Sequence, residues 1–255
     1  NETELYNGTN WSAGNTINTA RRYFPGVGTT TAGLIFGGTP PDTGATESYN
    51  GTNWTEVNDL NTARQHFGGA GANNTAALAF AGETDPSKVS ITELWNGTNW
   101  TEVNDLGTAR YQLAGTGLST DALAFGGAPT TPSGALTESW NGTNWTETGD
   151  LSTGRALLGG AGTTTAALAF GGEPSPTATE EFNTGVPIAN TWQTKANLNT
   201  PRSNLSGAGT TTAALAFGGQ SPPKNETEVY NGTNWTEVNN LNTARSRLAG
   251  AGVTN

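Results

Sequence analysis

The chain has 255 residues, of which 33% are hydrophobic and 36 are glycine, and this composition lies within the range of globular proteins. It contains no cysteine, which excludes disulfide frameworks and thiol chemistry, and its formal net charge of −10 argues against partners rich in phosphate, such as nucleic acids and anionic membranes. The sequence has no run of about 18 apolar residues, so no segment is predicted to cross a bilayer as a helix.

A repeat of about 45 residues runs along the whole chain and indicates a single domain over residues 1–255. The phrase N-G-T-N-W, or one altered copy of it, ends at six tryptophans, and an arginine recurs at the same spacing. The tryptophans are Trp11, Trp54, Trp100, Trp145, Trp192 and Trp235, and the arginines are Arg21, Arg64, Arg110, Arg155, Arg202 and Arg245. This period is found in propeller blades and also in helical HEAT and armadillo repeats.

Residues 2–14, at the start of the chain, are predicted to form two strands joined by a tight turn. Asn7 and Gly8 lie between Tyr6 and Trp11, and both residue types tolerate the positive φ that hairpin turns require. The same hairpin recurs along the chain. We expect its two aromatic rings to pack across the strands.

From Arg21 onward, each unit contains four short segments in a fixed order. The first is rich in Gly and Ala, as in Leu248–Gly252, and suits an innermost strand. The second alternates, so that in Ala76–Phe80 the side chains of Leu78 and Phe80 point to one face and the alanines to the other. The third and fourth form the hairpin. All four are bounded by Gly, Asn, Asp or Pro and lack helical spacing, which excludes the helical repeats.

A glycine pair after the apolar second strand, an aromatic residue in the third, a tryptophan in the fourth and an arginine after the next loop form a combination that resembles the kelch motif. The resemblance covers the whole chain and implies an all-β fold, a β-propeller of four-stranded antiparallel blades. The phrases Y-N-G-T-N-W, N-T-A-R-x-x-L-A-G-A-G and T-A-A-L-A-F-G-G are also similar to repeats of virion structural proteins of marine bacteriophages.

The second strand occurs only five times, whereas the first, third and fourth occur six times. We predict six blades with an incomplete closing blade, in which residues 246–251 are the inner strand and residues 2–14 the outer strands. Three explanations stay open: the sequence is part of a longer array, a neighbouring chain donates the strand, or five blades carry overhanging ends. We expect the gap to be filled from outside this chain or by residues beyond those given, because unpaired strand edges inside a blade are costly.

The sequence offers no machinery for catalysis, and we predict a protein that is not an enzyme and has no cofactor or metal. His66 is the only histidine, and nucleophile-elbow, phosphate-loop and calcium-loop motifs are absent. The recurring tryptophans and arginines are predicted to be structural. Each arginine has a matching glutamate, which favours ion-pair braces over the alternative of a ligand-binding carboxylate ring. The 14 N-glycosylation sequons are turn formers, or glycan sites in a eukaryotic secreted protein.

The segment after each glycine pair differs in every unit, and variable loops on a rigid scaffold are typical of binding surfaces. We expect these loops at the end of the propeller that also carries the connections between blades. Neutral drift of tolerant loops explains the variation equally well. The candidate binding residues are Pro40, Asp42, Asp85, Lys88, Thr131, Ser133, Glu173, Ser175, Pro222 and Lys224.

These features predict a non-enzymatic interaction or structural protein in an extracellular or virion setting. Its expected partner is a host-surface glycan or protein, or other subunits of an assembly, with a homo-oligomer or strand completion by a neighbouring chain included. The alternative is a lectin that binds small saccharides in repeated pockets between blades, built from the recurring tryptophans and asparagines.

Overall fold

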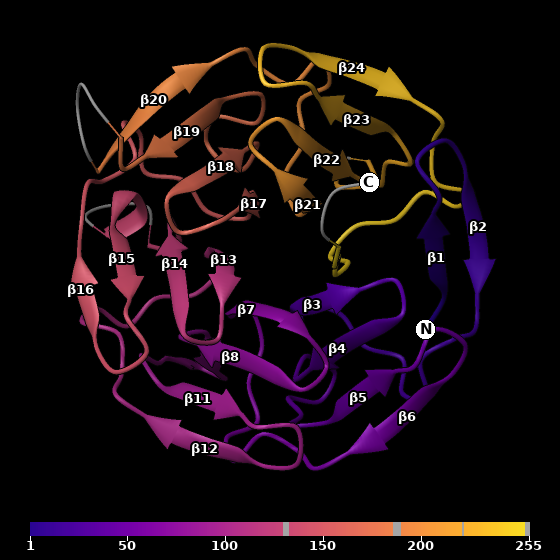
Figure 1. Ribbon diagram of the computed structural model, residues 1–255, viewed down its shortest axis with the longest axis vertical. Helices are drawn as coiled ribbons and strands as arrows, with labels where there is room; N and C mark the ends of the chain where they lie inside the picture. Colours follow the sequence, from indigo (N-terminus) through magenta and orange to yellow (C-terminus); the bar gives the residue numbers. More distant parts are fainter. Residues whose placement is uncertain (130–132, 186–189, 221, 253–255) are drawn as a thin grey trace.

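The computed structural model describes residues 1–129, 133–185, 190–220 and 222–252, and it is an all-β propeller (Figure 1). Five four-stranded antiparallel sheets form blades around a central axis, and the strands of each blade follow chain order from the axis outward. A two-stranded sheet lies between the fifth blade and the first. The predicted propeller of antiparallel four-stranded blades is therefore confirmed.

The first blade contains β3 (Gly26–Thr29), β4 (Ala32–Phe36), β5 (Thr46–Tyr49) and β6 (Trp54–Val57). The second contains β7 (Gly68–Asn73), β8 (Ala76–Phe80), β11 (Thr92–Trp95) and β12 (Trp100–Val103). The third contains β13 (Ala114–Leu118), β14 (Asp121–Phe125), β15 (Thr137–Trp140) and β16 (Trp145–Glu147). The fourth contains β17 (Gly159–Gly162), β18 (Ala166–Phe170), β19 (Thr179–Asn183) and β20 (Thr191–Lys195). The fifth contains β21 (Ser206–Thr210), β22 (Ala213–Phe217), β23 (Thr227–Tyr230) and β24 (Trp235–Val238).

Outside these blades lie the pair β1 (Thr3–Tyr6) and β2 (Trp11–Gly14), a short hairpin of β9 (Glu83–Thr84) and β10 (Ser87–Lys88), and the 3₁₀ turn η1 (Ser133–Ala135).

The alternation of the second strands determines how neighbouring blades pack. In β8, Ala77 and Ala79 belong to a buried cluster with Phe36 of the first blade. Leu78 and Phe80 belong to a different cluster, together with alanines of β14 in the third blade. Each blade therefore presents large side chains to the next blade and small ones to the preceding blade. This complementarity lets the sheets pack closely around the axis.

The tryptophan that opens each fourth strand ties its blade to the preceding one. The Trp145 indole Nε1 donates a hydrogen bond to the Thr92 hydroxyl at 3.1 Å, and its ring packs on Phe80 with 5.0 Å between ring centroids. Five tryptophans make both equivalent contacts: Trp11, Trp100, Trp145, Trp192 and Trp235.

Each recurring arginine forms an ion pair with the recurring glutamate of the next blade. Arg110 and Glu138 lie 2.6 Å apart, and both side chains are buried. Burial lowers the pKa of the Arg110 guanidinium, and the adjacent Glu138 carboxylate opposes this shift. The pairs are Arg21–Glu47, Arg64–Glu93, Arg110–Glu138, Arg155–Glu180, Arg202–Glu228 and Arg245–Glu4.

A circle of backbone hydrogen bonds surrounds the axis at the connections between blades. One residue of each connection has positive φ and donates its N–H to the carbonyl of its counterpart in the preceding connection, at 2.7–3.3 Å. The last bond, from Tyr23 to the carbonyl of Arg247, joins the two ends of the chain. The six residues are Tyr23, His66, Gln112, Leu157, Asn204 and Arg247.

The blade count is five, not the predicted six. β1 and β2 pair only with each other, and residues 246–252, whose first part was expected to form an inner strand, belong to no described sheet. The reason is that residues 1–255 contain no second strand to connect the two pieces, so they cannot form one ladder. They nevertheless occupy a sixth sector of the ring (Figure 1).

We expect Arg110→Ala to destabilise the fold by about 3–5 kcal/mol, because it leaves the buried Glu138 carboxylate without its cation. The midpoint of urea unfolding measures this loss. Lys88→Ala, on the exposed β10, is the control and should leave the midpoint unchanged.

The double variant Arg110→Met with Glu138→Leu tests the cause of that loss. Replacing both ions with apolar residues of similar size removes the unpaired charge, so most of the stability should return. A double variant as unstable as Arg110→Ala would contradict the ion-pair explanation.

Candidate functional site

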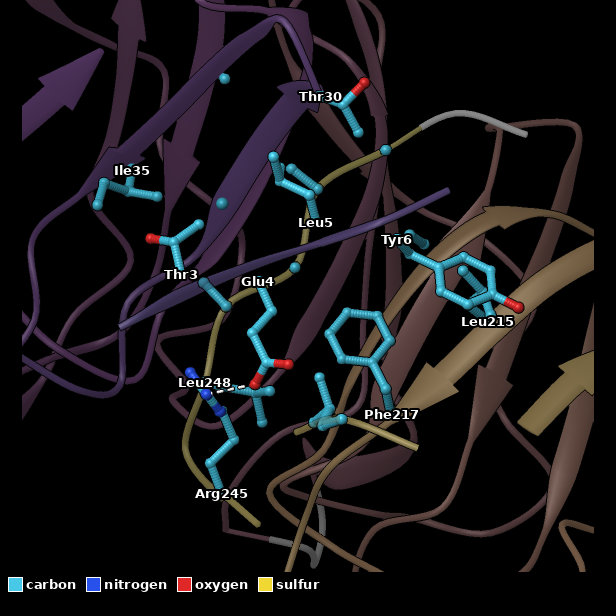
Figure 2. Close-up of a pocket in the computed structure, with 18 of the residues that line it drawn as sticks. Thr3, Glu4, Leu5, Tyr6, Thr30, Ile35, Leu215, Phe217, Arg245 and Leu248 are labelled. Carbon is cyan, nitrogen blue, oxygen red and sulfur yellow. Dashed lines mark hydrogen bonds and ion pairs between the residues drawn. The ribbon is translucent and has the colours of Figure 1, made fainter. Parts of the chain in front are cut away.

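A cavity of about 720 Å³ lies in the sixth sector, between the fifth blade and the first. Its walls are β1 on the outer side, residues 246–252 near the axis, β22 of the fifth blade and β4 of the first. We call this cavity with its four walls the open sector. Figure 2 shows side chains from all four walls around one space, including Tyr6, Ile35, Phe217 and Leu248.

β1 has an unpaired backbone edge toward the open sector. The Asn7 N–H donates to the carbonyl of Asn10 across the hairpin. Because hydrogen-bonded and non-bonded pairs alternate along an antiparallel ladder, Glu4 and Tyr6 must direct their N–H and C=O groups away from β2. No described strand pairs with β1 on that side. The edge therefore offers a ready ladder for one more strand.

Residues of β1 are more exposed as a whole than their counterparts in the complete blades, although the Glu4 side chain itself is buried in its ion pair with Arg245. Thr3, Glu4 and Tyr6 are half-buried, whereas the equivalent residues of β5, β11, β15, β19 and β23 are buried. In each complete blade, a second strand covers these positions. The exposure of β1 is thus the direct consequence of the missing strand.

Trp54 is the one tryptophan of the six repeats that lacks both contacts to a preceding blade. Its Nε1 is buried and has no hydrogen-bond partner among the described residues. The other five tryptophans donate to a threonine of the preceding blade's third strand and pack on a phenylalanine of its second strand. For Trp54 the equivalent acceptor would be the Thr3 hydroxyl, and the equivalent ring would be a phenylalanine of the sixth sector's second strand. Trp54 itself lines the cavity. The two missing interactions therefore coincide at one place.

Arg245 and Glu4 hold the open sector together by joining the last connection of the chain to its first strand. The Asn242 N–H also donates to Glu4, at 2.8 Å. The Arg245 side chain remains 19% exposed, whereas that of Arg110, in a complete blade, is fully buried. Without a second strand above it, this closing ion pair borders the cavity, as Figure 2 shows.

The variable loops lie at the end of the ring that carries the connections between blades. The Leu60 N–H, in such a connection, donates to the carbonyl of Gly44 in a variable loop at 3.0 Å. Among the predicted binding residues, Asp42 and Asp85 come together, because the Asp85 N–H donates to an Asp42 carboxylate oxygen at 3.0 Å. This bond links the loops of the first and second blades.

The other predicted residues are spread over the loops of different blades. Pro40 shares the loop of Asp42, Lys88 lies on β10, Ser133 begins η1, Glu173 and Ser175 lie in the fourth blade's loop, and Pro222 and Lys224 lie in the fifth blade's loop. Thr131 lies outside the described residues.

A smaller cavity of about 100 Å³ lies at the axis, beside the circle of backbone hydrogen bonds. His66 Nδ1 lies 2.7 Å from a Glu83 carboxylate oxygen, and the His66 and Tyr23 rings are in contact, with 3.6 Å between centroids and planes tilted by 42°. The Arg247 guanidinium lies 5.1 Å from the Tyr23 ring centroid. These contacts with its neighbours account for the position of His66.

Within the described ranges, no group of three or more His, Asp or Glu residues is placed to hold a metal ion. Nor does any described helix have the length and apolar character needed to cross a membrane.

The sequence predicted that one sector lacks its second strand, but it did not identify the residues that line this open sector. The count of strands signalled one absent second strand. Leu215, Phe217 and Trp54 looked like ordinary members of the repeat, and only their position beside the gap distinguishes them. The order of blades around a closed ring was the signal that could have identified them.

No family model and no curated protein matches the chain. Among solved structures it is similar to one described as "Structure of YjhT", with a TM-score of 0.76 and 12% sequence identity. The match covers 92% of this chain and 88% of that one. The neighbour is also a propeller, and at this identity the similarity establishes the fold alone.

We expect His66 to make stability depend on pH. Burial lowers the pKa of its imidazole, and the hydrogen bond to the Glu83 carboxylate only partly opposes this shift. The folded protein therefore binds fewer protons than the unfolded chain below about pH 6.5, so stability is present above that pH and is lost as the pH falls. Urea midpoints at about pH 7.5 and about pH 5.5 measure the change.

His66→Gln is the matched variant, because Gln112 occupies the same place in the next connection. It should lose the part of the pH dependence between these two values. An unchanged slope would show that His66 is not the titrating group.

Proposed function

We propose that the protein is a non-enzymatic interaction protein of an extracellular or virion surface, which joins other subunits of an assembly through its open sector. The observation that carries this proposal is a propeller whose sixth sector has inner and outer pieces but, in the part of the chain that the structure describes, no second strand between them. A β-sheet with an unpaired edge recognises an extended segment of another polypeptide by adding it as a strand.

The chemistry of the open sector supports a polypeptide partner. Its outer wall offers backbone donors and acceptors, and its side walls offer the apolar side chains of Ile35, Leu215 and Phe217. Main-chain groups provide affinity in strand addition, and side-chain pockets provide selectivity. The charged pair of Arg245 and Glu4 is satisfied within the chain, so it acts as a clamp for the sector's walls.

Sequence features support the proposed setting. The repeat phrases are similar to those of virion structural proteins, and the surface is rich in neutral Thr and Asn rather than in basic residues. A lectin would need the recurring tryptophans and asparagines in its pockets. Five of the six tryptophans instead make hydrogen bonds between blades, and so do recurring asparagines, as Asn58 does to Asn99 at 2.8 Å. This favours contact with other subunits over saccharide binding as the main activity.

A photo-crosslinking amino acid at Tyr6, in the assembly that contains the protein, should give an adduct with one defined polypeptide. Tyr6 lines the open sector, and a strand added to β1 would lie beside it. Mass spectrometry of the adduct identifies the cross-linked segment.

The matched control places the same group at Ser175, in the fourth blade's loop. We expect no adduct there. Adducts at Ser175 alone would move the contact to the variable loops, and adducts at neither position would argue against an assembly role.

A further inference from the structure

Resting on the proposed function, we infer that the open sector binds one strand of a partner subunit whose sequence follows the pattern of this chain's own second strands, A-A-L-A-F-G-G. The five complete blades provide the template for this strand. Each pairs a second strand of nearly this sequence with its third strand in the same register.

The register at β1 follows from that template. In the second blade Phe80 pairs with Thr92 and Leu78 with Leu94. In the open sector, the partner's phenylalanine position therefore lies opposite Thr3 and its leucine position opposite Leu5. The two alanine positions lie opposite Glu4 and Tyr6, whose backbone groups form the unpaired edge.

The two faces of the added strand meet different walls. By the packing order of the blades, its alanines face Leu215 and Phe217 of the fifth blade, where larger side chains would clash. Its leucine and phenylalanine face Gly33 and Ile35 of the first blade, the positions that Ala77 and Ala79 occupy in β8. The sector therefore selects a strand with small residues on one face and large ones on the other.

Two polar side chains at the open sector, the Trp54 indole and the Arg245 guanidinium, also fit this strand, and of these the Trp54 Nε1 is the one without a partner among the described residues. The partner's phenylalanine would pack on the Trp54 ring, as Phe80 packs on Trp145, and the seated ring would bring the buried Trp54 Nε1 toward Thr3. Arg245 would donate to a strand carbonyl, as Arg64 donates to the carbonyl of Ala79. The ring contact and the tryptophan-to-threonine bond recur at the equivalent residues of other blades, and Arg110 donates to the carbonyl of Ala124 as Arg64 does to that of Ala79.

A second folded copy of residues 1–255 does not supply this strand. Its five second strands are already central in complete blades, each paired on both edges. Releasing one would break a blade in order to complete a sector. A partner subunit that supplies the strand must instead carry the pattern in a segment that is free to extend.

Substitution of Ile35 tests how tightly the open sector binds the added strand. The equivalent residues in the other four complete blades are alanines, namely Ala79, Ala124, Ala169 and Ala216. Ile35 projects into the space that the partner's large side chains would enter. Ile35→Ala should therefore tighten binding by about tenfold, because it relieves crowding at the contact.

The probe is a synthetic peptide, T-A-A-L-A-F-G-G followed by two lysines for solubility. Binding is followed by the NMR signal of the Trp54 indole, assigned with Trp54→Phe, and by hydrogen exchange of residues 1–14. We expect saturable binding that shifts this indole signal and slows exchange at Glu4 and Tyr6 by at least about tenfold. Leu118→Ala, on an exposed side chain away from the open sector, should leave the affinity unchanged.

A control peptide of the same composition, T-A-A-A-L-F-G-G with two lysines, has its large residues on opposite faces. Equal binding of this control, or no protection at Glu4 and Tyr6, would overturn the inference.

A chain extended after Asn255 by A-A-L-A-F-G-G tests completion from within the same polypeptide. If only the extended chain protects β1, the sector is completed intramolecularly and the partner-subunit strand is wrong.

These results separate the inference from the proposed function. A cross-link from position 6 to a segment without the alternating pattern would uphold the assembly role and reject the strand chemistry. Specific peptide binding without any cross-link in the assembly would do the reverse.

Discussion

The packing of large side chains of one blade against alanines of the next is the constraint on which the rest of this propeller depends. It requires that every second strand keep strict alternation, because a shift by one residue would exchange the two faces. Phe36, Phe80, Phe125 and Phe170 are all fully buried in this arrangement. The tryptophan-to-threonine bonds and the arginine–glutamate pairs then fix the relative position of sheets that are already in close contact.

Because each blade needs a neighbour on both sides, the ring must close. The chain closes it near the axis and at the outer strands, but not in the layer of second strands between them. Near the axis the Tyr23 N–H reaches the carbonyl of Arg247, and farther out Arg245 reaches Glu4. Between these contacts no described residue takes the place of the second strand, which is the element that carries the large side chains. The ring is thus closed by polar contacts and left open in its apolar layer.

Much of the fold could be predicted from sequence because it depends on local pattern. Leu78 and Phe80 alternate with alanines, and Asn50 and Gly51 mark a turn that the structure places between β5 and β6. The number of blades was wrong because residues 246–251 resemble an inner strand in sequence but have no ladder partner. The candidate site was harder still. Its lining residues are separated by more than 200 positions and meet only when the ring closes.

An unpaired strand edge is ordinarily a risk of aggregation, and the geometry of the open sector limits that risk. β1 faces inward, between two complete blades, so a flat sheet from another molecule has no room to align with it. An entering strand must bring small residues to Leu215 and Phe217 and large ones to Gly33 and Ile35. A net charge of −10 further disfavours association between copies of the chain. The features that make the sector incomplete are therefore the same ones that make it selective.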